Sequence, residues 1–276
     1  MIRDITIGQY YKADSVIHRL DPRVKLMGTL IFIISLFMGM NIWIYAVVTL
    51  ALAVVIKMSR IPLKFMVRGL KSIVILIIIS AVFNLFLTPG DVLIQIWKLT
   101  ITYQGLKMAI FMVVRLIYLI VGTSLMTLTT TPNNLTDGLE KGLGFLKVIK
   151  VPVHEIAMMM SIALRFIPIL IEETDKIMKA QMARGADFEH GNIIKRAKSM
   201  VPLLVPLFVS AFRRADDLAM AMEARCYNGG EGRTKMKPLV YEKDDKIAYL
   251  FIFAFLAVVI VLRILLPVNL GNLIFR

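Results

Sequence analysis

The sequence predicts an all-α integral membrane protein with about five transmembrane helices and long amphipathic helices on the cytoplasmic side. Of its 276 residues, 58% are hydrophobic, and its mean hydropathy of +0.75 exceeds that of ordinary soluble domains. The apolar residues gather in runs that approach the roughly 20 residues a helix needs to cross a bilayer. The net charge of +14 is typical of a membrane protein with basic cytoplasmic loops, and no RNA- or DNA-binding motif accompanies it.

Five apolar stretches account for the predicted spans. Residues 26–56 are almost continuously apolar with an interruption near Gly39–Asn41, so we expect two short helices joined by a tight hairpin. The other three spans are expected at residues 73–87, 105–130 and 247–266.

Lysine and arginine set the predicted orientation. Basic residues crowd the segment before the first span and the loop 57–71, which has no acidic residue, whereas the loop 88–104 has only Asp91 and Lys98 as charged residues. Because Lys and Arg concentrate on cytoplasmic loops, we expect a multi-pass protein of the cell membrane with a cytoplasmic N-terminus. The chain then divides into a membrane region of four spans (1–130), a cytoplasmic segment (131–245) and a final transmembrane helix with a short external tail (246–276).

The cytoplasmic segment contains two apolar runs that we expect to lie at the membrane boundary in a V or L arrangement. Each run is followed by a similar helix end: ETDKIMKAQMARG at 173–185 and RADDLAMAMEARC at 214–226. Gly185 is expected to terminate the first helix, and Gly229-Gly230 the second. These two ends are the main candidate site.

Arg184 and Arg225, which close the two helix ends, have two explanations. A cation at a helix C-terminus is favoured by the macrodipole by about 0.3–1 kcal/mol, which requires no partner. Alternatively, each end inserts into a groove of a partner protein, where the planar guanidinium pairs with a carboxylate through two hydrogen bonds. Two similar ends would then imply two similar sockets.

Two further features stand out in the membrane region. Asp21-Pro22-Arg23 precedes the first span, where aspartate caps a helix and proline takes its first turn. Arg23 is free to bind lipid headgroups or to tie the N-terminus to the cytoplasmic segment. Arg115 interrupts the fourth span. Because a charge at the centre of a membrane helix costs roughly 2.5–3.5 kcal/mol, we expect Arg115 to face protein or water.

Ala183-Arg184-Gly185 and Ala224-Arg225-Cys226 resemble the paired Ala-Arg-X signatures of energy-coupling factor transporters. They mark the transmembrane T component of that family, a group that includes the cobalt-transport CbiQ proteins. The stretch HRLDPRVKL at 18–26 is similar to the N-terminal Leu-Asp-Pro-Arg segment of the family, and the resemblance covers essentially the whole chain. Cys226 departs from the pattern, since serine or glycine is more usual at that position.

The resemblance implies a non-catalytic subunit, without a cofactor, of an importer for a vitamin or a metal ion. Two ABC ATPase subunits would each receive one of the two signatures, and the difference between Gly185 and Cys226 favours distinct ATPases. One or several substrate-binding S components would lie against the apolar helices. Candidate contacts with an S component are Arg115 and six adaptable methionines: Met158, Met159, Met178, Met182, Met220 and Met222. The chain has no G-x-x-x-x-G-K-[ST] motif, so a partner must bind the nucleotide.

An enzyme and an ion-coupled carrier are the two other function classes open to a membrane chain of this kind. A membrane-embedded interfacial enzyme would use acidic residues such as Glu155, Glu172, Glu173, Asp216 and Asp217, but they form no recognised catalytic spacing. An ion-coupled carrier would need acidic residues inside the spans, and the five predicted spans contain none. The three histidines and the single cysteine show no metal-ligand spacing.

Overall fold

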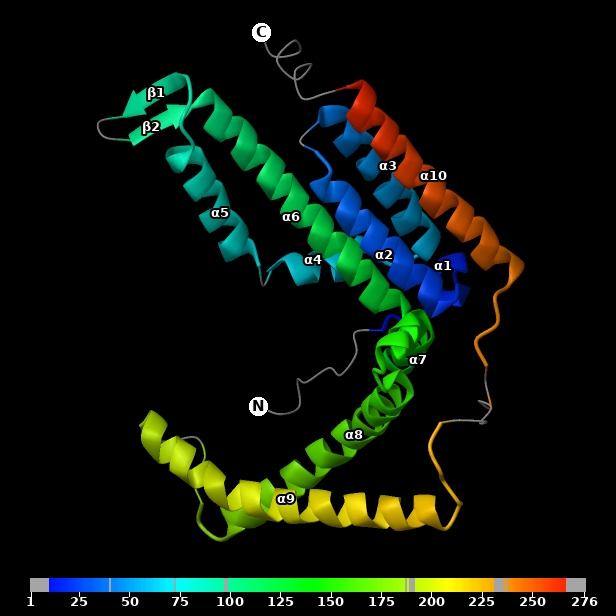
Figure 1. Cartoon of the computed structure of the whole chain (residues 1–276). Helices are drawn as coiled ribbons and strands as arrows, with labels where there is room; N and C mark the ends of the chain where they lie inside the picture. Colours follow the sequence, from blue (N-terminus) through cyan, green and yellow to red (C-terminus); the bar gives the residue numbers. More distant parts are fainter. Residues whose placement is uncertain are drawn as a thin grey trace. The chain divides into compact units, whose positions relative to one another are not determined.

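The computed structural model describes residues 10–39, 41–71, 73–96, 99–186, 188, 192–230, 236 and 238–266 (Figure 1). These residues are helical almost throughout, which confirms the predicted all-α class. They fall into two compact units. The first, here called the membrane unit, contains the described residues of Gly8–Gly138 and Leu239–Arg276. The second, here called the crossed-helix unit, contains those of Leu139–Pro238.

The membrane unit contains the helices at the five predicted spans. Its elements are α1 (Val16–Arg19), α2 (Pro22–Phe37), α3 (Ile42–Ser59), α4 (Leu63–Lys71), α5 (Val74–Leu87), β1 (Val92–Ile96), β2 (Leu99–Thr102), α6 (Tyr103–Thr129), the start of α7 (Pro132–Gly142) and α10 (Lys243–Leu265). The hairpin between α2 and α3 was expected, and Asn41 there caps α3 while donating to the Leu266 carbonyl at the end of α10, 2.7 Å away. The antiparallel pair β1–β2 was not expected in the loop 88–104.

Length and composition identify α3, α6, α8 (Val153–Ala183) and α10 as helices able to cross a bilayer. The pair α4 and α5, whose axes differ by 63°, makes a fifth if it counts as one span. These numbers agree with the predicted total of about five. The identities differ, because α2 has 16 residues and is too short for this criterion, whereas α8 was expected at the membrane boundary.

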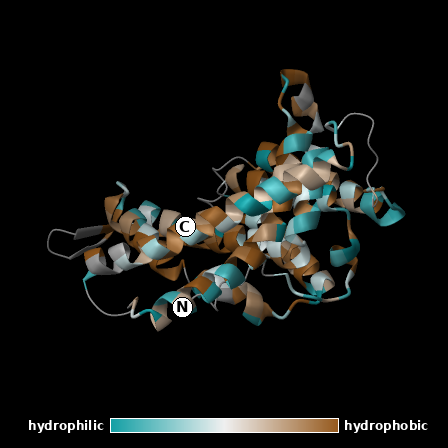
Figure 2. Cartoon of the chain, turned by 90° about the horizontal axis from the view of Figure 1, so that it is seen from below, coloured by the Kyte–Doolittle hydropathy of each residue, from teal (hydrophilic) through white to brown (hydrophobic). Residues whose placement is uncertain are grey.

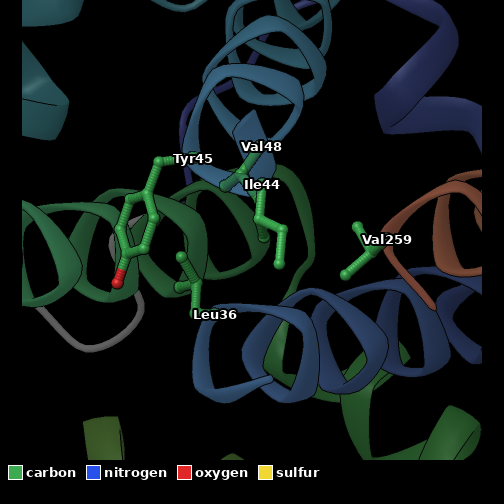
Figure 3. Close-up of a cluster of buried hydrophobic side chains, with 5 residues drawn as sticks. All are labelled: Leu36, Ile44, Tyr45, Val48 and Val259. Carbon is green, nitrogen blue, oxygen red and sulfur yellow. The ribbon is translucent and has the colours of Figure 1, made fainter. Parts of the chain in front are cut away.

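A cluster of buried side chains joins α2, α3 and α10 in the membrane unit. Leu36, Ile44, Tyr45, Val48 and Val259 are between 0% and 6% exposed and converge on one another, with α6 lying alongside (Figure 3). Phe111, Val114 and Tyr118 of α6 pack against this cluster. The core therefore depends on helices from both ends of the chain.

Outward faces of the same helices are also apolar. Figure 2 shows hydrophobic residues on the outside of the helices as well as between them. Leu50, Ile75, Leu250 and Phe251 are each between 67% and 71% exposed. Exposed apolar area on this scale is what a lipid-facing surface requires, and it supports a multi-pass membrane protein.

The crossed-helix unit is built on two helices of 31 residues each, α8 and α9 (Ile193–Glu223), preceded by the short helix η2 (Gly144–Ile149). Both long helices run through internal prolines, Pro168 in α8 and Pro202 and Pro206 in α9. Each of the two apolar runs falls in one of these long helices, residues 151–171 mostly in α8 and residues 201–212 in α9. Figure 1 shows α8 and α9 crossing rather than meeting at their ends, so the expected V or L arrangement is wrong.

Candidate functional site

The first signature, Ala183-Arg184-Gly185, forms the C-terminal cap of α8. Gly185 takes a left-handed conformation with φ of 88°, as predicted for a glycine that ends a helix. Its amide donates to the Met182 carbonyl at 2.9 Å, and the next amide, of Ala186, donates to the Gln181 carbonyl at 3.0 Å. This pair of hydrogen bonds is a Schellman motif, which satisfies carbonyls at the helix end and stops the helix directly after Arg184.

The second signature forms the same cap at the end of α9. Cys226 is left-handed, with φ of 54°, and its amide donates to the Glu223 carbonyl at 2.8 Å. The next amide, of Tyr227, donates to the Met222 carbonyl at 3.0 Å. The helix is therefore stopped by Cys226 itself, and the expectation that Gly229-Gly230 would stop it is wrong. The third residue of each signature is the one that must adopt positive φ, which explains why glycine is suited to it.

Cys226→Gly is expected to stabilise the second helix end. A non-glycine residue in the left-handed region costs roughly 1–2 kcal/mol, part of which glycine loses again through greater freedom in the unfolded chain. We expect the free energy of unfolding to rise by about 1 kcal/mol, measured by thermal unfolding of the purified full chain. Gly185→Val is the opposite change and should lower it, because a branched side chain fits positive φ poorly. A lower unfolding temperature for Cys226→Gly would contradict this account of the cap.

An ion pair joins the two helices where they cross. Glu173 of α8 accepts from the Nη2 of Arg214 of α9 at 3.1 Å, and both side chains are partly buried. The 41 residues that separate Glu173 from Arg214 also separate Arg184 from Arg225. Glu173 and Arg214 therefore occupy equivalent positions in the two similar stretches at 173–185 and 214–226. Beyond the crossing each helix extends by an arm of about 16 Å at 1.5 Å per residue, which ends in an arginine.

The tips of both arms are exposed. Ala183, Arg184, Ala224 and Arg225 are all solvent-accessible, and so is Cys226. Among the described residues, no ion pair shorter than 4.0 Å joins either arginine to an acidic side chain of the chain itself. Within the described part of the chain neither guanidinium forms an ion pair, which leaves both accessible to a partner.

The six candidate methionines differ in accessibility. Met159, Met182 and Met220 are 58%, 48% and 60% exposed, respectively, and all lie on α8 or α9. Half-buried positions are occupied by Met158, Met178 and Met222.

Arg115 is buried in the membrane unit, as expected for a charge that faces protein. It is 8% exposed, its Nε donates to the Tyr45 hydroxyl at 3.0 Å, and its guanidinium carbon lies 5.2 Å from the centre of the Phe37 ring. These contacts hold Arg115 against α2 and α3 of its own chain. The burial does not favour its expected contact with an S component.

Asp21, Pro22 and Arg23 begin α2 in the predicted way. The Asp21 carboxylate accepts from the Arg23 amide at 2.8 Å, and Pro22 occupies the first turn. The same carboxylate pairs with the Arg23 guanidinium, which stacks over the Tyr241 ring with 3.7 Å from its carbon to the ring centre. Arg23 therefore ties the N-terminal region to the end of the segment 131–245.

Asp245 also holds the start of α2, a role that the sequence did not predict. It is 3% exposed, and its two carboxylate oxygens accept from the backbone amides of Asp21 and Glu242, each at 2.8 Å. One side chain thus caps α10 and holds the start of α2. In the sequence, Asp245 is recognisable only as one of two acidic residues at the start of the last helix.

Comparison with known protein families finds relatives that match most of the chain. Residues 13–236 match the model of the CbiQ family, described as cobalt transport protein. Curated relatives extend the match to nearly the full length. Energy-coupling factor transporter transmembrane protein EcfT of Thermosediminibacter oceani is 58% identical over 90% of this chain and 94% of its own length.

The chain belongs to the family of energy-coupling factor T components. The EcfT proteins of Clostridium kluyveri and Bacillus subtilis are 54% and 47% identical to it, over 96% and 95% of this chain and 98% and 100% of their own lengths. It is therefore a transmembrane transport component and, as the names of its relatives indicate, a non-catalytic subunit. The resemblance of the two Ala-Arg-X signatures to those of the T components predicted this membership.

The geometry of this T component gives little support to the alternative of an interfacial enzyme. Of the five acidic candidates, Glu173 is committed to the ion pair with Arg214. Within the residues that the structure describes, no group of three or more His, Cys, Asp or Glu side chains could hold a metal ion. The exposed arginine tips therefore remain the candidate site.

Proposed function

We propose that this T component couples ATP hydrolysis in two partner ATPases to the movement of a substrate-binding S component during uptake of a vitamin or a metal ion. The observation that carries the proposal is the pair of identically capped, exposed helix ends, one tipped by Arg184 and the other by Arg225. Each arginine would pair with a carboxylate in the groove of one ATPase. The different third residues, Gly185 and Cys226, favour two distinct ATPases.

The crossing of α8 and α9 supports a lever role for the arms. A groove of about 630 Å³ lies at the crossing, lined by both apolar and charged residues, including Ile177, Val209, Arg213 and Asp217. The two helices are joined there by the ion pair of Glu173 with Arg214. When the two ATPases close on ATP, they would draw the tips together, and the parts of α8 and α9 before the crossing would move in response.

The distribution of basic residues supports a cytoplasmic N-terminus and a cytoplasmic location of both arms, where ATP is available. An S component would lie against apolar helices of this chain. α5 is suited to that contact, because Ile75, Leu76 and Phe83 are 71%, 59% and 58% exposed, respectively. The exposed methionines of α8 and α9 would adapt to S components of different shape.

Mass spectrometry of the proteins that co-purify with a tagged chain from native membranes tests the proposal. The expected result is two ABC ATPase polypeptides and at least one small, apolar membrane protein in stoichiometric amounts. Recovery of the chain alone, under mild detergent conditions that preserve other membrane complexes, would count against the coupling role. A metal-dependent hydrolytic activity of the isolated chain would favour the enzyme alternative.

A further inference from the structure

Gly230 lies in close contact with the imidazole of His154. A Cβ placed on Gly230 would be 2.7 Å from Cγ and 2.8 Å from Nε2 of His154, closer than real Cβ atoms approach other groups. Glycine therefore allows the backbone after the second signature to lie directly on the histidine ring. This contact brings the chain that leaves α9 back to the start of α8.

His154 is itself held in place. Its Nδ1 lies 2.9 Å from Oε1 of Glu140, near the end of α7, and the two side chains are 28% and 16% exposed, respectively. Val153 and Ala157 on either side are each 6% exposed. The histidine ring is thus a fixed surface, anchored by α7 on one side and by the start of α8 on the other.

These contacts hold the second arm at two points. At its base, Arg214 pairs with Glu173 of α8. Beyond its tip, Gly230 rests on His154, which also belongs to α8. The five residue-to-residue steps from Arg225 to Gly230 span at most about 18 Å, so the tip cannot move far from this contact.

We propose that His154, Glu140 and Gly230 form a brace that fixes the direction of the second arm and so positions Arg225 for its ATPase. His154 and Glu140 are positioning residues, because neither lies at the arginine tip. A rigid helix held at its base and beyond its tip cannot swing about the crossing without breaking one of the two contacts. The effect of the brace on transport rests on the proposed coupling function, whereas the contacts that form the brace all lie within this chain.

A Cβ on Gly185, the glycine of the first signature, would meet nothing within 4 Å. The same holds for Gly142, near the end of α7. Gly142 therefore offers a matched control, in which alanine adds a methyl group without filling a contact.

Spin labels test the brace directly. Cys226 is the only cysteine of the sequence and is exposed at the tip of the second arm, and Met160→Cys adds a second exposed site on α8. Double electron–electron resonance on the full chain in lipid nanodiscs then measures the distance distribution between tip and α8. We expect Gly230→Ala to widen it about twofold, because an arm freed beyond its tip samples many orientations. Gly142→Ala should leave it unchanged.

The double variant makes the test specific. His154→Ala removes the ring on which Gly230 rests, so it should widen the distribution about as much as Gly230→Ala does, and His154→Ala/Gly230→Ala should be no wider than either single variant. Equal widths for Gly230→Ala and the unsubstituted chain, or a double variant clearly wider than both single variants, would overturn the brace.

Unlabelled variants in the complete transporter separate the brace from the coupling function. Gly230→Ala should reduce uptake by about tenfold, a size typical of coupling between distant sites, and the double variant should reduce it no further. If the spin-label distances change as expected while uptake does not, the brace stands and the proposed role of Arg225 in coupling is refuted.

Discussion

Arg184→Glu and Arg225→Glu are each expected to abolish assembly with an ATPase and therefore uptake. Both side chains are exposed at the ends of capped helices, so the substitutions leave the fold of the arms intact. In the partner's groove a carboxylate would then face a carboxylate. Truncating one member of a hydrogen-bonded charge pair already costs about 2–5 kcal/mol. At 1.4 kcal/mol for each factor of ten, affinity falls by more than about tenfold. Co-purification and substrate uptake are the measurements.

Two control variants make this result interpretable. Arg184→Lys keeps the charge but loses the planar fork, so we expect partial loss of ATPase binding. Arg19→Glu reverses another exposed arginine on the predicted cytoplasmic side, where its partner is Asp14 of the same chain, and should change neither assembly nor uptake. If the double variant Arg184→Glu/Arg225→Glu co-purifies with both ATPases and transports normally, the arms do not act as connectors.

Asp245→Ala is expected to destabilise the membrane unit strongly. The buried carboxylate accepts from the backbone amides of Asp21 and Glu242. Alanine would leave both donors without this acceptor at the junction of α2 and α10. Leaving a buried donor unsatisfied costs about 1–3 kcal/mol, so we expect a loss of roughly 3 kcal/mol in the free energy of unfolding. Thermal unfolding of the purified chain measures the effect.

Asp244→Ala is the matched control for this variant. Asp244 is the neighbouring acidic residue in the same first turn of α10 but is exposed. Its loss removes only a favourable interaction with the helix dipole, worth about 0.3–1 kcal/mol. Equal unfolding temperatures for Asp244→Ala and Asp245→Ala would show that the buried contact does not hold α10 to α2.

The membrane helices could be predicted because their signal is local. A bilayer requires continuous hydrogen-bonded helices of apolar residues, so composition alone located α3, α5, α6 and α10. The helices of the segment 131–245 were harder to predict, because their sequence mixes apolar runs with charged stretches. Pro168, Pro202 and Pro206 lie inside α8 and α9, and only the structure shows that each helix continues through its prolines.

At the site, the parts that depend on backbone geometry near one residue were predictable and those that depend on distant contacts were not. Gly185 was correctly expected to end its helix. Cys226 was misread because a left-handed cysteine has no sequence signal comparable to glycine. The pair Glu173–Arg214 and the contact of Asp245 with the start of α2 join residues far apart in the chain, so periodicity and motifs cannot reveal them.

Photo-crosslinking from Ala183 and Ala224 tests the central claim most directly. Each alanine is exposed and adjacent to one arginine tip, so a benzoylphenylalanine there reports what touches that tip while leaving Arg184 and Arg225 in place. In the assembled transporter, illumination should attach one ATPase subunit at each position, and a different one at the two positions if the ATPases are distinct. An intact complex that yields no ATPase adduct from either position would contradict the assignment of these helix ends as the coupling site.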